Sequence, residues 1–137
     1  MVQAASALRI LVVEDCPDTS DEFRLLLELW GHDVLVAPDA ETAMTLAWAF
    51  RPQVVLLDLG RPAVKGLDVA RRLRRAPPDA APALVAATGP DTRAVRLRAW
   101  EAGCSHFFAE PLDQGALRAV LSVPLPRPRA RRSERVT

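Results

Sequence analysis

The chain has 137 residues, of which 50% are hydrophobic and 26% charged, with 18 basic and 17 acidic side chains. This length suits one domain with an ordinary hydrophobic core and leaves no room for a second. No apolar stretch is long enough to cross a bilayer, and the first residues lack the basic segment and apolar run of a secretory signal, so we expect a cytoplasmic protein.

The near-neutral charge averages two unlike parts. Residues 124–137 contain five arginines and one glutamate, whereas residues 1–123 hold 13 basic and 16 acidic side chains. Prolines at 124, 126 and 128 favour an extended, solvated segment. We therefore expect a folded domain over residues 1–123 and a disordered basic tail over 124–137. The tail has no aromatic residue for base stacking, so we do not expect it to bind nucleic acid.

Apolar runs alternate along the chain with segments that have the 3.6-residue apolar spacing of helices. The runs predict strands at about residues 8–13, 34–37, 53–58, 83–88 and 106–109. Helices are expected to begin near residue 19, after residue 39, after residue 66, near residue 91 and near residue 113. Strand–helix units in this order predict a doubly wound α/β fold with a parallel sheet.

Local signals predict where the helices begin and end. Thr19 and Glu22 have capping-box spacing in the first helix, which is expected to end at Gly31. Asp39 is expected to cap the second helix, which stops at Arg51 because a proline follows. The side chains expected to face the core are those of Phe23, Leu26, Leu27, Trp30, Ala43, Leu46, Ala47, Phe50, Val69, Ala70, Leu73, Val95, Ala99, Ala102, Leu117, Val120 and Leu121. The arginines expected to face solvent are Arg71, Arg72, Arg74 and Arg75.

Carboxylates follow two of the predicted strands. The run ILVV continues into Glu14 and Asp15, and the run VVLL ends on Asp58. Strands buried on both faces of a parallel sheet end at one edge, where such folds place their sites, so the three acids are expected to meet there. Like charges buried together need a cation or a proton, and all-oxygen ligands suit a hard ion such as Mg²⁺. The sequence thus predicts a functional site around Asp58.

Five short motifs, taken together, resemble a response-regulator receiver domain of two-component signalling, over about residues 8–122. They are Glu14-Asp15 after the first strand, Asp58 ending the third, Pro62 and Gly66 in the next loop, Thr88-Gly89 after the fourth, and Ala102-Gly103 before a strand that closes on Glu110-Pro111. The resemblance implies a flavodoxin-like fold with strand order 2-1-3-4-5, bound Mg²⁺, and phosphoryl transfer from a histidine kinase or phosphotransfer protein. It implies a signalling phosphoacceptor rather than an enzyme, one that at most catalyses its own phosphorylation and dephosphorylation.

The resemblance also implies a role for each matching residue. Asp58 is the phosphoacceptor, Thr88 offers its hydroxyl to a phosphoryl oxygen, and Phe107 is the aromatic residue that swings inward behind that threonine. The expected metal ligands are Glu14, Asp15, Asp58 and the backbone carbonyl of Gly60.

Glu110 departs from this pattern, because the family has a lysine before the final proline, where its ammonium pairs with the phosphoryl group. At about 4 Å and an effective dielectric of about 20, each unit charge pair contributes on the order of 4 kcal/mol, so the exchange would cost several kcal/mol. Glu110 could join the metal ligands, take up a proton or turn into solvent. Lys65, the chain's only lysine, could act as a substitute cation. A cis Glu110–Pro111 bond remains open.

Two functions follow from these observations. We expect a single-domain receiver in a phosphorelay that accepts a phosphoryl group on Asp58 and signals through protein contacts. The alternative is a receiver-like interaction module that works without phosphorylation, which Glu110 would favour. A phosphatase of the haloacid-dehalogenase type fits poorly, because it needs a second acid where this chain has Gly60.

The fourth predicted helix offers a candidate output surface. Trp100 is expected to be partly exposed on a stripe that includes Arg93, Arg96 and Leu97, and could anchor a downstream protein on the face of the fourth helix, fifth strand and fifth helix. Trp30 and Trp48 are expected in the core or at its edge. We expect a monomer or weak homodimer. Cys16 and Cys104 form no paired framework and are expected to be inert thiols.

Overall fold

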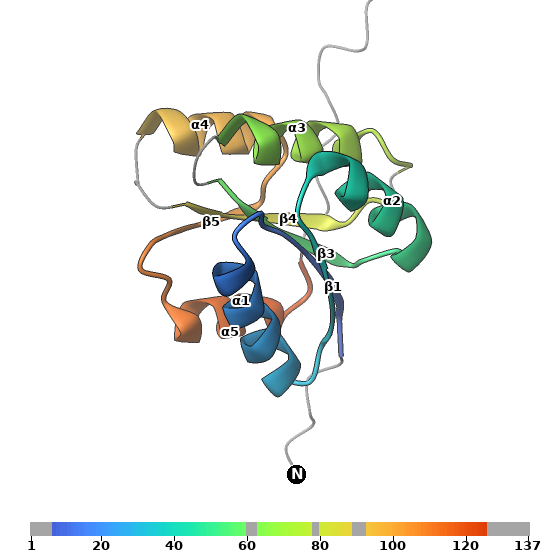
Figure 1. Cartoon of the computed structure of the whole chain (residues 1–137). Coiled ribbons are helices and arrows are strands. Elements are labelled where there is room, and N and C mark those ends of the chain that lie inside the picture. The colour runs from blue at the N-terminus through green and yellow to red at the C-terminus, as the bar shows by residue number, and fades with distance from the viewer. Residues whose placement is uncertain (1–6, 60–62, 78–79, 89–92, 126–137) are drawn as a thin grey trace, which may run out of the picture.

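The computed structural model describes residues 7–59, 63–77, 80–88 and 93–125. Strands and helices alternate throughout (Figure 1). In chain order they are β1 (Arg9–Val13), α1 (Pro17–Leu29), β2 (Asp33–Ala37), α2 (Ala40–Phe50), β3 (Val54–Asp58), α3 (Ala63–Arg74), β4 (Ala83–Thr88), α4 (Arg93–Glu101), β5 (His106–Ala109) and α5 (Gln114–Leu121).

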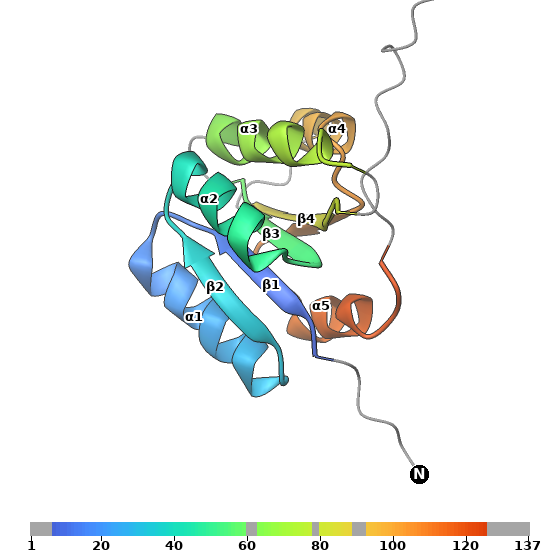
Figure 2. The same cartoon turned by 90° about the vertical axis from the view of Figure 1, so that its right-hand side faces the viewer.

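The five strands form one parallel sheet in the order β2-β1-β3-β4-β5, which confirms the predicted topology. Helices α1 and α5 cover one face of the sheet, and α2, α3 and α4 cover the other (Figures 1 and 2). Because every strand runs in the same direction, all five carboxyl ends lie at one edge of the sheet. No helix in the described ranges is long and apolar enough to span a membrane.

Alternate side chains of the central strands build two hydrophobic cores, one on each face of the sheet. Leu11 and Leu57 belong to the core under α2, α3 and α4, together with Ala43, Val69 and Ala99. The core under α1 and α5 contains Ile10, Val12, Val54, Leu56, Val85, Phe23, Leu27, Leu117 and Leu121. Strands buried on both faces explain why the sequence shows unbroken apolar runs rather than alternation.

Two of the predicted helix starts are wrong. Helix α1 begins at Pro17 with Cys16 at its cap position, so Thr19 and Glu22 form no capping box at its start. Proline suits the first helical position because its fixed φ matches the helix and its missing N–H would have no partner there. Helix α3 begins at Ala63, which places Gly66 inside the helix rather than before it.

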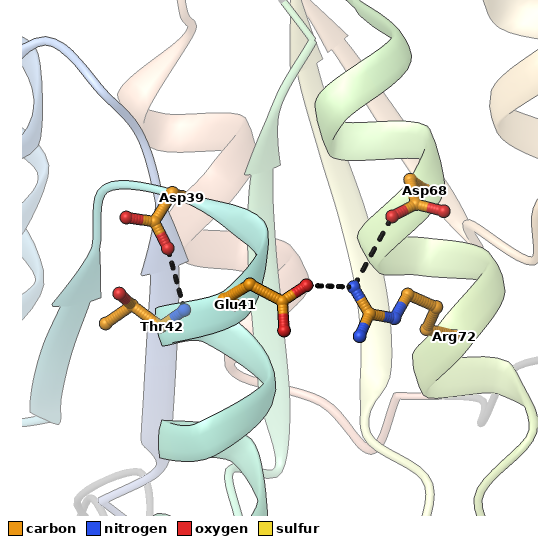
Figure 3. Close-up of polar contacts among 5 residues, drawn as sticks. All are labelled: Asp39, Glu41, Thr42, Asp68 and Arg72. Atoms are coloured by element: carbon orange, nitrogen blue, oxygen red, sulfur yellow. Dashed lines mark hydrogen bonds and ion pairs between the residues drawn. The ribbon is translucent and has the colours of Figure 1, made fainter.

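The predicted ends of α2 are confirmed. The amide of Thr42 donates a hydrogen bond of 2.7 Å to Asp39 Oδ1 (Figure 3). At the other end, Arg51 adopts a left-handed conformation with φ of 54° and closes the helix through its amide, which donates to the carbonyl of Ala47. Gly31, which follows α1, likewise has a positive φ of 97°.

Most side chains expected in the core are buried, but several cover its edge. Half-buried are Leu26, Trp30, Leu46, Ala47, Phe50, Val95 and Val120. Trp100 is 56% exposed, as expected, whereas Trp48 is 76% exposed, so its predicted place in the core or at the edge of the core is wrong. Trp48 lies about 100° around the helix from Ala47, so it points away from the sheet that Ala47 approaches.

The arginines at the end of α3 also differ from the prediction. Arg71 and Arg75 are exposed, but Arg72 and Arg74 are half-buried. Arg72 binds Glu41 of α2 at 3.0 Å, and Arg74 donates to the carbonyl of Glu101 at the end of α4. These two arginines therefore join α3 to both neighbouring helices instead of facing solvent.

Candidate functional site

Four acidic residues gather at the carboxyl edge of the sheet. Val13, the last residue of β1, pairs with Leu57, so Glu14 follows next to Asp58 at the end of β3. Asp15 comes directly after Glu14, and Glu110 follows the last residue of β5. The predicted convergence of Glu14, Asp15 and Asp58 is thus found in the structure, and Glu110 lies close enough to Asp58 to feel its charge.

Glu14 is the buried member of this cluster, with only 6% of its surface exposed. Its Oε2 accepts a hydrogen bond of 3.1 Å from the amide of Cys16. Within the part of the chain that the structure describes, its Oε1 is buried without a hydrogen-bond partner. Burial, and then the neighbouring carboxylate of Asp58, raise the pKa of Glu14 to about 8. Among the residues that the structure describes, no cationic side chain contributes to the pKa of this carboxyl group.

Glu110 is exposed, yet it remains within the electrostatic field of Asp58. Partial burial, and then the charge of Asp58, raise the pKa of Glu110 above its ordinary value. The Glu110–Pro111 peptide bond is cis, the isomer that the sequence left open. Glu110 thus adds negative charge where the resemblance implies a cation.

Phe107 occupies the middle of β5 and is half-buried against the core under α3 and α4. The guanidinium carbon of Arg96 lies 4.8 Å from the centre of its ring, a cation–π contact between α4 and β5. The sequence pattern placed Arg96 only beside Trp100 and did not predict this contact. A pair separated by a loop leaves no periodic signal, so tertiary structure alone reveals it.

Several predicted site residues lie outside the described residues. These are Gly60, Pro62 and Gly89, and the side chains of Lys65 and Thr88 are likewise outside the described part of the chain. The roles predicted for the Gly60 carbonyl, the Thr88 hydroxyl and the Lys65 ammonium therefore stay predictions.

Gly66 allows α3 to approach the end of β3 closely. A Cβ atom on this glycine would clash with Leu59 Cδ2 and would lie 3.2 Å from the carbonyl oxygen of Asp58. The sequence pattern placed Gly66 in a loop, but in the structure its role is steric, because a larger residue would press on the Leu59 side chain and on the carbonyl of Asp58.

The cluster has the donor atoms of a cation site, although its geometry is incomplete. Across residues 7–59, 63–77, 80–88 and 93–125, no three His, Cys, Asp or Glu side chains are arranged as a metal site. The chemistry of the donors nevertheless suits a hard divalent cation, because all are oxygens and Glu14 Oε1 is buried without a partner. Burial, and then the charge of Asp58, raise the pKa of Glu14 and of Glu110, and a cation here would offset both effects.

Comparison with known proteins gives a consistent result. The sequence model of the family described as response regulator receiver domain matches residues 10–122. Protein PilH of Pseudomonas aeruginosa is 28% identical over 109 residues, covering 80% of this chain and 90% of PilH. The response regulator PleD of Caulobacter vibrioides is 32% identical over 105 residues, covering 77% of this chain but only 23% of PleD.

A solved structure agrees with these sequence matches. The crystal structure of a response regulator signal receiver domain from Bermanella marisrubri has a TM-score of 0.74 and 29% identity. The superposition covers 83% of this chain and 94% of that one. The likeness therefore extends over nearly all of the described residues.

Proposed function

Because the chain belongs to the response regulator receiver domain family of two-component signalling, we propose that it accepts a phosphoryl group on Asp58 from a histidine kinase or phosphotransfer protein. In this proposal the chain is a phosphoacceptor in the cytoplasm and passes its signal on through protein contacts. It has no substrate turnover beyond its own phosphorylation and dephosphorylation.

The observation that carries the proposal is the buried carboxyl group of Glu14 beside Asp58. Burying an acid next to another acid is unfavourable, and the raised pKa of Glu14 reports that cost. A domain used only as a scaffold has no need of such a cluster. A reaction that needs several oxygen ligands around one cation would explain why the acids are clustered.

The proposed reaction is an in-line displacement at phosphorus. A carboxylate oxygen of Asp58 attacks the phosphorus of a phosphohistidine, the phosphorus–nitrogen bond breaks, and the phosphoryl group ends on Asp58 as an acyl phosphate. Thr88 would then donate its hydroxyl proton to a phosphoryl oxygen, and Phe107 would move inward behind it. Bound Mg²⁺ would supply charge neutralisation for the phosphoryl oxygens, held by Glu14, Asp15, Asp58 and the carbonyl of Gly60.

Glu110 is expected to weaken this reaction without abolishing it. Its carboxylate adds repulsion against both Asp58 and an incoming phosphoryl group, but solvent screens a side chain that is exposed. We therefore expect slower phosphorylation and lower occupancy than a lysine at this position would give.

The test is the intact-protein mass after incubation with acetyl phosphate and Mg²⁺. We expect a phosphoryl adduct on the wild type, none on Asp58→Asn, and a higher occupancy on Glu110→Lys. Asp21→Asn, which changes an exposed carboxylate on α1, serves as the matched control and should behave as the wild type. An adduct that persists in Asp58→Asn would contradict the assignment of the phosphoacceptor.

The charge at Glu110 also favours a second candidate, an interaction module that works without phosphorylation. In that case its partner would contact the surface of α4 and β5, where Leu97 and Trp100 are each 56% exposed. The same experiment separates the two functions. If the wild type forms no phosphoryl adduct but Glu110→Lys does, the chain has a receiver fold that acts without being phosphorylated.

A further inference from the structure

A groove far from the acidic cluster lies between the final turns of α2 and α3. Its volume is about 450 Å³, and apolar side chains including Met44, Leu73 and Pro82 line it. Pro52, two residues before β3, and Pro82, directly before β4, form part of its wall. The groove therefore lies at the amino edge of the sheet, opposite the edge that carries Asp58.

Trp48 stands at this groove and is 76% exposed. The guanidinium carbon of Arg51 lies 5.2 Å from the centre of its ring. The backbone of Arg51 is fixed, because it closes α2 in a left-handed conformation and its carbonyl accepts a hydrogen bond of 2.9 Å from Arg9 Nε. The exposed indole, with the guanidinium of Arg51 against its ring, offers a partner a large apolar surface.

Among the described residues, every charged side chain that lines the groove is an arginine: Arg51, Arg72 and Arg75. Arg72 is already engaged with Glu41 and Asp68 (Figure 3). Helix dipoles account for arginines near two helix ends, but they do not account for a tryptophan exposed between them. An exposed tryptophan with arginines around an apolar groove has the composition of an interface hot spot.

We propose that this groove binds an acidic segment of another protein that inserts an apolar side chain beside Trp48. Because Arg72 is already paired, the charges of Arg51 and Arg75 favour glutamate and aspartate in the partner, and the apolar lining accommodates an apolar side chain between those acids. A partner held here leaves the carboxyl edge of the sheet open. The site could therefore tether a partner in either state of Asp58.

The probe is a fluorescein-labelled synthetic peptide with a phenylalanine–leucine pair flanked on both sides by glutamates. The control peptide has lysines in place of the glutamates. Fluorescence anisotropy with the full chain, without metal or phosphoryl donor, should show salt-sensitive binding of the acidic peptide only. Trp48→Ala and Arg75→Glu should each weaken it about tenfold or more, because interface anchors of these residue types carry most of the binding energy.

Matched variants on α4 make the test specific. Trp100→Ala and Arg98→Glu change another exposed tryptophan and another exposed arginine and should leave the affinity unchanged. Absence of binding, equal binding of the lysine peptide, or binding that survives Trp48→Ala would overturn the proposal. Self-association that Trp48→Ala abolishes, measured by analytical ultracentrifugation, would also overturn it by showing that a second copy occupies the groove.

Discussion

At the scale of single residues, the environment of Asp58 is set by charge. Asp58 raises the pKa of Glu14, after burial, and also contributes to the raised pKa of Glu110. Each of these acids is favourable only when a proton or a cation offsets its neighbours. The cluster therefore reduces the free energy of unfolding, and it creates a site that attracts positive charge.

Removal of one charge should accordingly stabilise the protein. We expect Asp58→Asn to raise the free energy of unfolding by about 1 kcal/mol, and the melting temperature by about 3–5 °C, in metal-free buffer. Thermal melts followed by circular dichroism measure this, with Asp21→Asn as control. The gain should shrink when Mg²⁺ is added; an unchanged or lower melting temperature without metal would show that the acids do not repel one another.

His32 illustrates a different single-residue effect, in the core rather than at the site. It is 8% exposed, and its Nδ1 accepts a hydrogen bond of 3.0 Å from the amide of Leu8. Burial, and then the positive charge of Arg118, lower the pKa of His32, while Asp33 opposes the shift. The folded protein thus holds this ring neutral at a pH where the unfolded chain would protonate it.

This difference predicts how stability depends on pH. Below about pH 6.5, the ordinary histidine pKa, the unfolded chain binds more protons at His32 than the folded one, so the contribution of this residue to stability falls as the pH falls. Urea denaturation should show that the free energy of unfolding falls less between pH 7.5 and pH 5.5 in His32→Asn than in the wild type. The side-chain oxygen of the asparagine can still accept a hydrogen bond from the amide of Leu8. His106→Asn is the control, and an equal loss in wild type and His32→Asn would exclude His32 as the source.

At the scale of elements, contacts made by residues near the helix ends fix the position of α3 relative to its neighbours. Arg72 ties α3 to α2 and Arg74 ties α3 to α4, while Gly66 permits α3 to approach β3. The periodic pattern of α3 correctly predicted its buried face, Val69, Ala70 and Leu73. It could not show these contacts, because each depends on a neighbour far away in the sequence.

Gly66→Ala tests the close approach of α3. We expect it to lower the free energy of unfolding by about 1–3 kcal/mol, since the new methyl group would clash with Leu59 in a packed core. Gly115→Ala in α5 is the matched control, because its Cβ would lie 3.4 Å from Asp113 Oδ1, in ordinary contact. That change should be neutral or stabilising, since alanine favours a helix over glycine by about 1 kcal/mol. Urea denaturation of both variants measures the difference. Equal free energies of unfolding for the two variants would show that α3 can shift to make room for the methyl group.

At the scale of the whole molecule, the sheet separates two cores and also two kinds of surface. The acidic cluster lies at the carboxyl edge, whereas Trp48 and its arginines lie at the amino edge. Neighbouring residues of one strand serve different cores: Leu56 faces α1 and α5, and Leu57 faces α2, α3 and α4. The two cores share every strand, so they should unfold together.

Shortening a side chain in either core should therefore lower the free energy of the same single unfolding transition. Leu57→Ala and Leu56→Ala should each cost about 2–5 kcal/mol, because both side chains are buried. Leu29→Ala, at a position 81% exposed, should change stability by less than about 0.5 kcal/mol. Denaturation followed by tryptophan fluorescence and by circular dichroism should coincide for all three variants; a variant whose two signals separate would indicate cores that unfold independently.

The sequence by itself determined the fold class, the strand order through its family resemblance, and the meeting of Glu14, Asp15 and Asp58. Apolar runs and helical spacing are local patterns, and in a parallel sheet the ends of strands must share an edge. Only the tertiary structure decided that Gly66 of α3 lies against the end of β3, that Arg96 covers Phe107 and that Trp48 faces solvent beside Arg51. These facts depend on which surfaces meet when helices pack, and no spacing within one element encodes that.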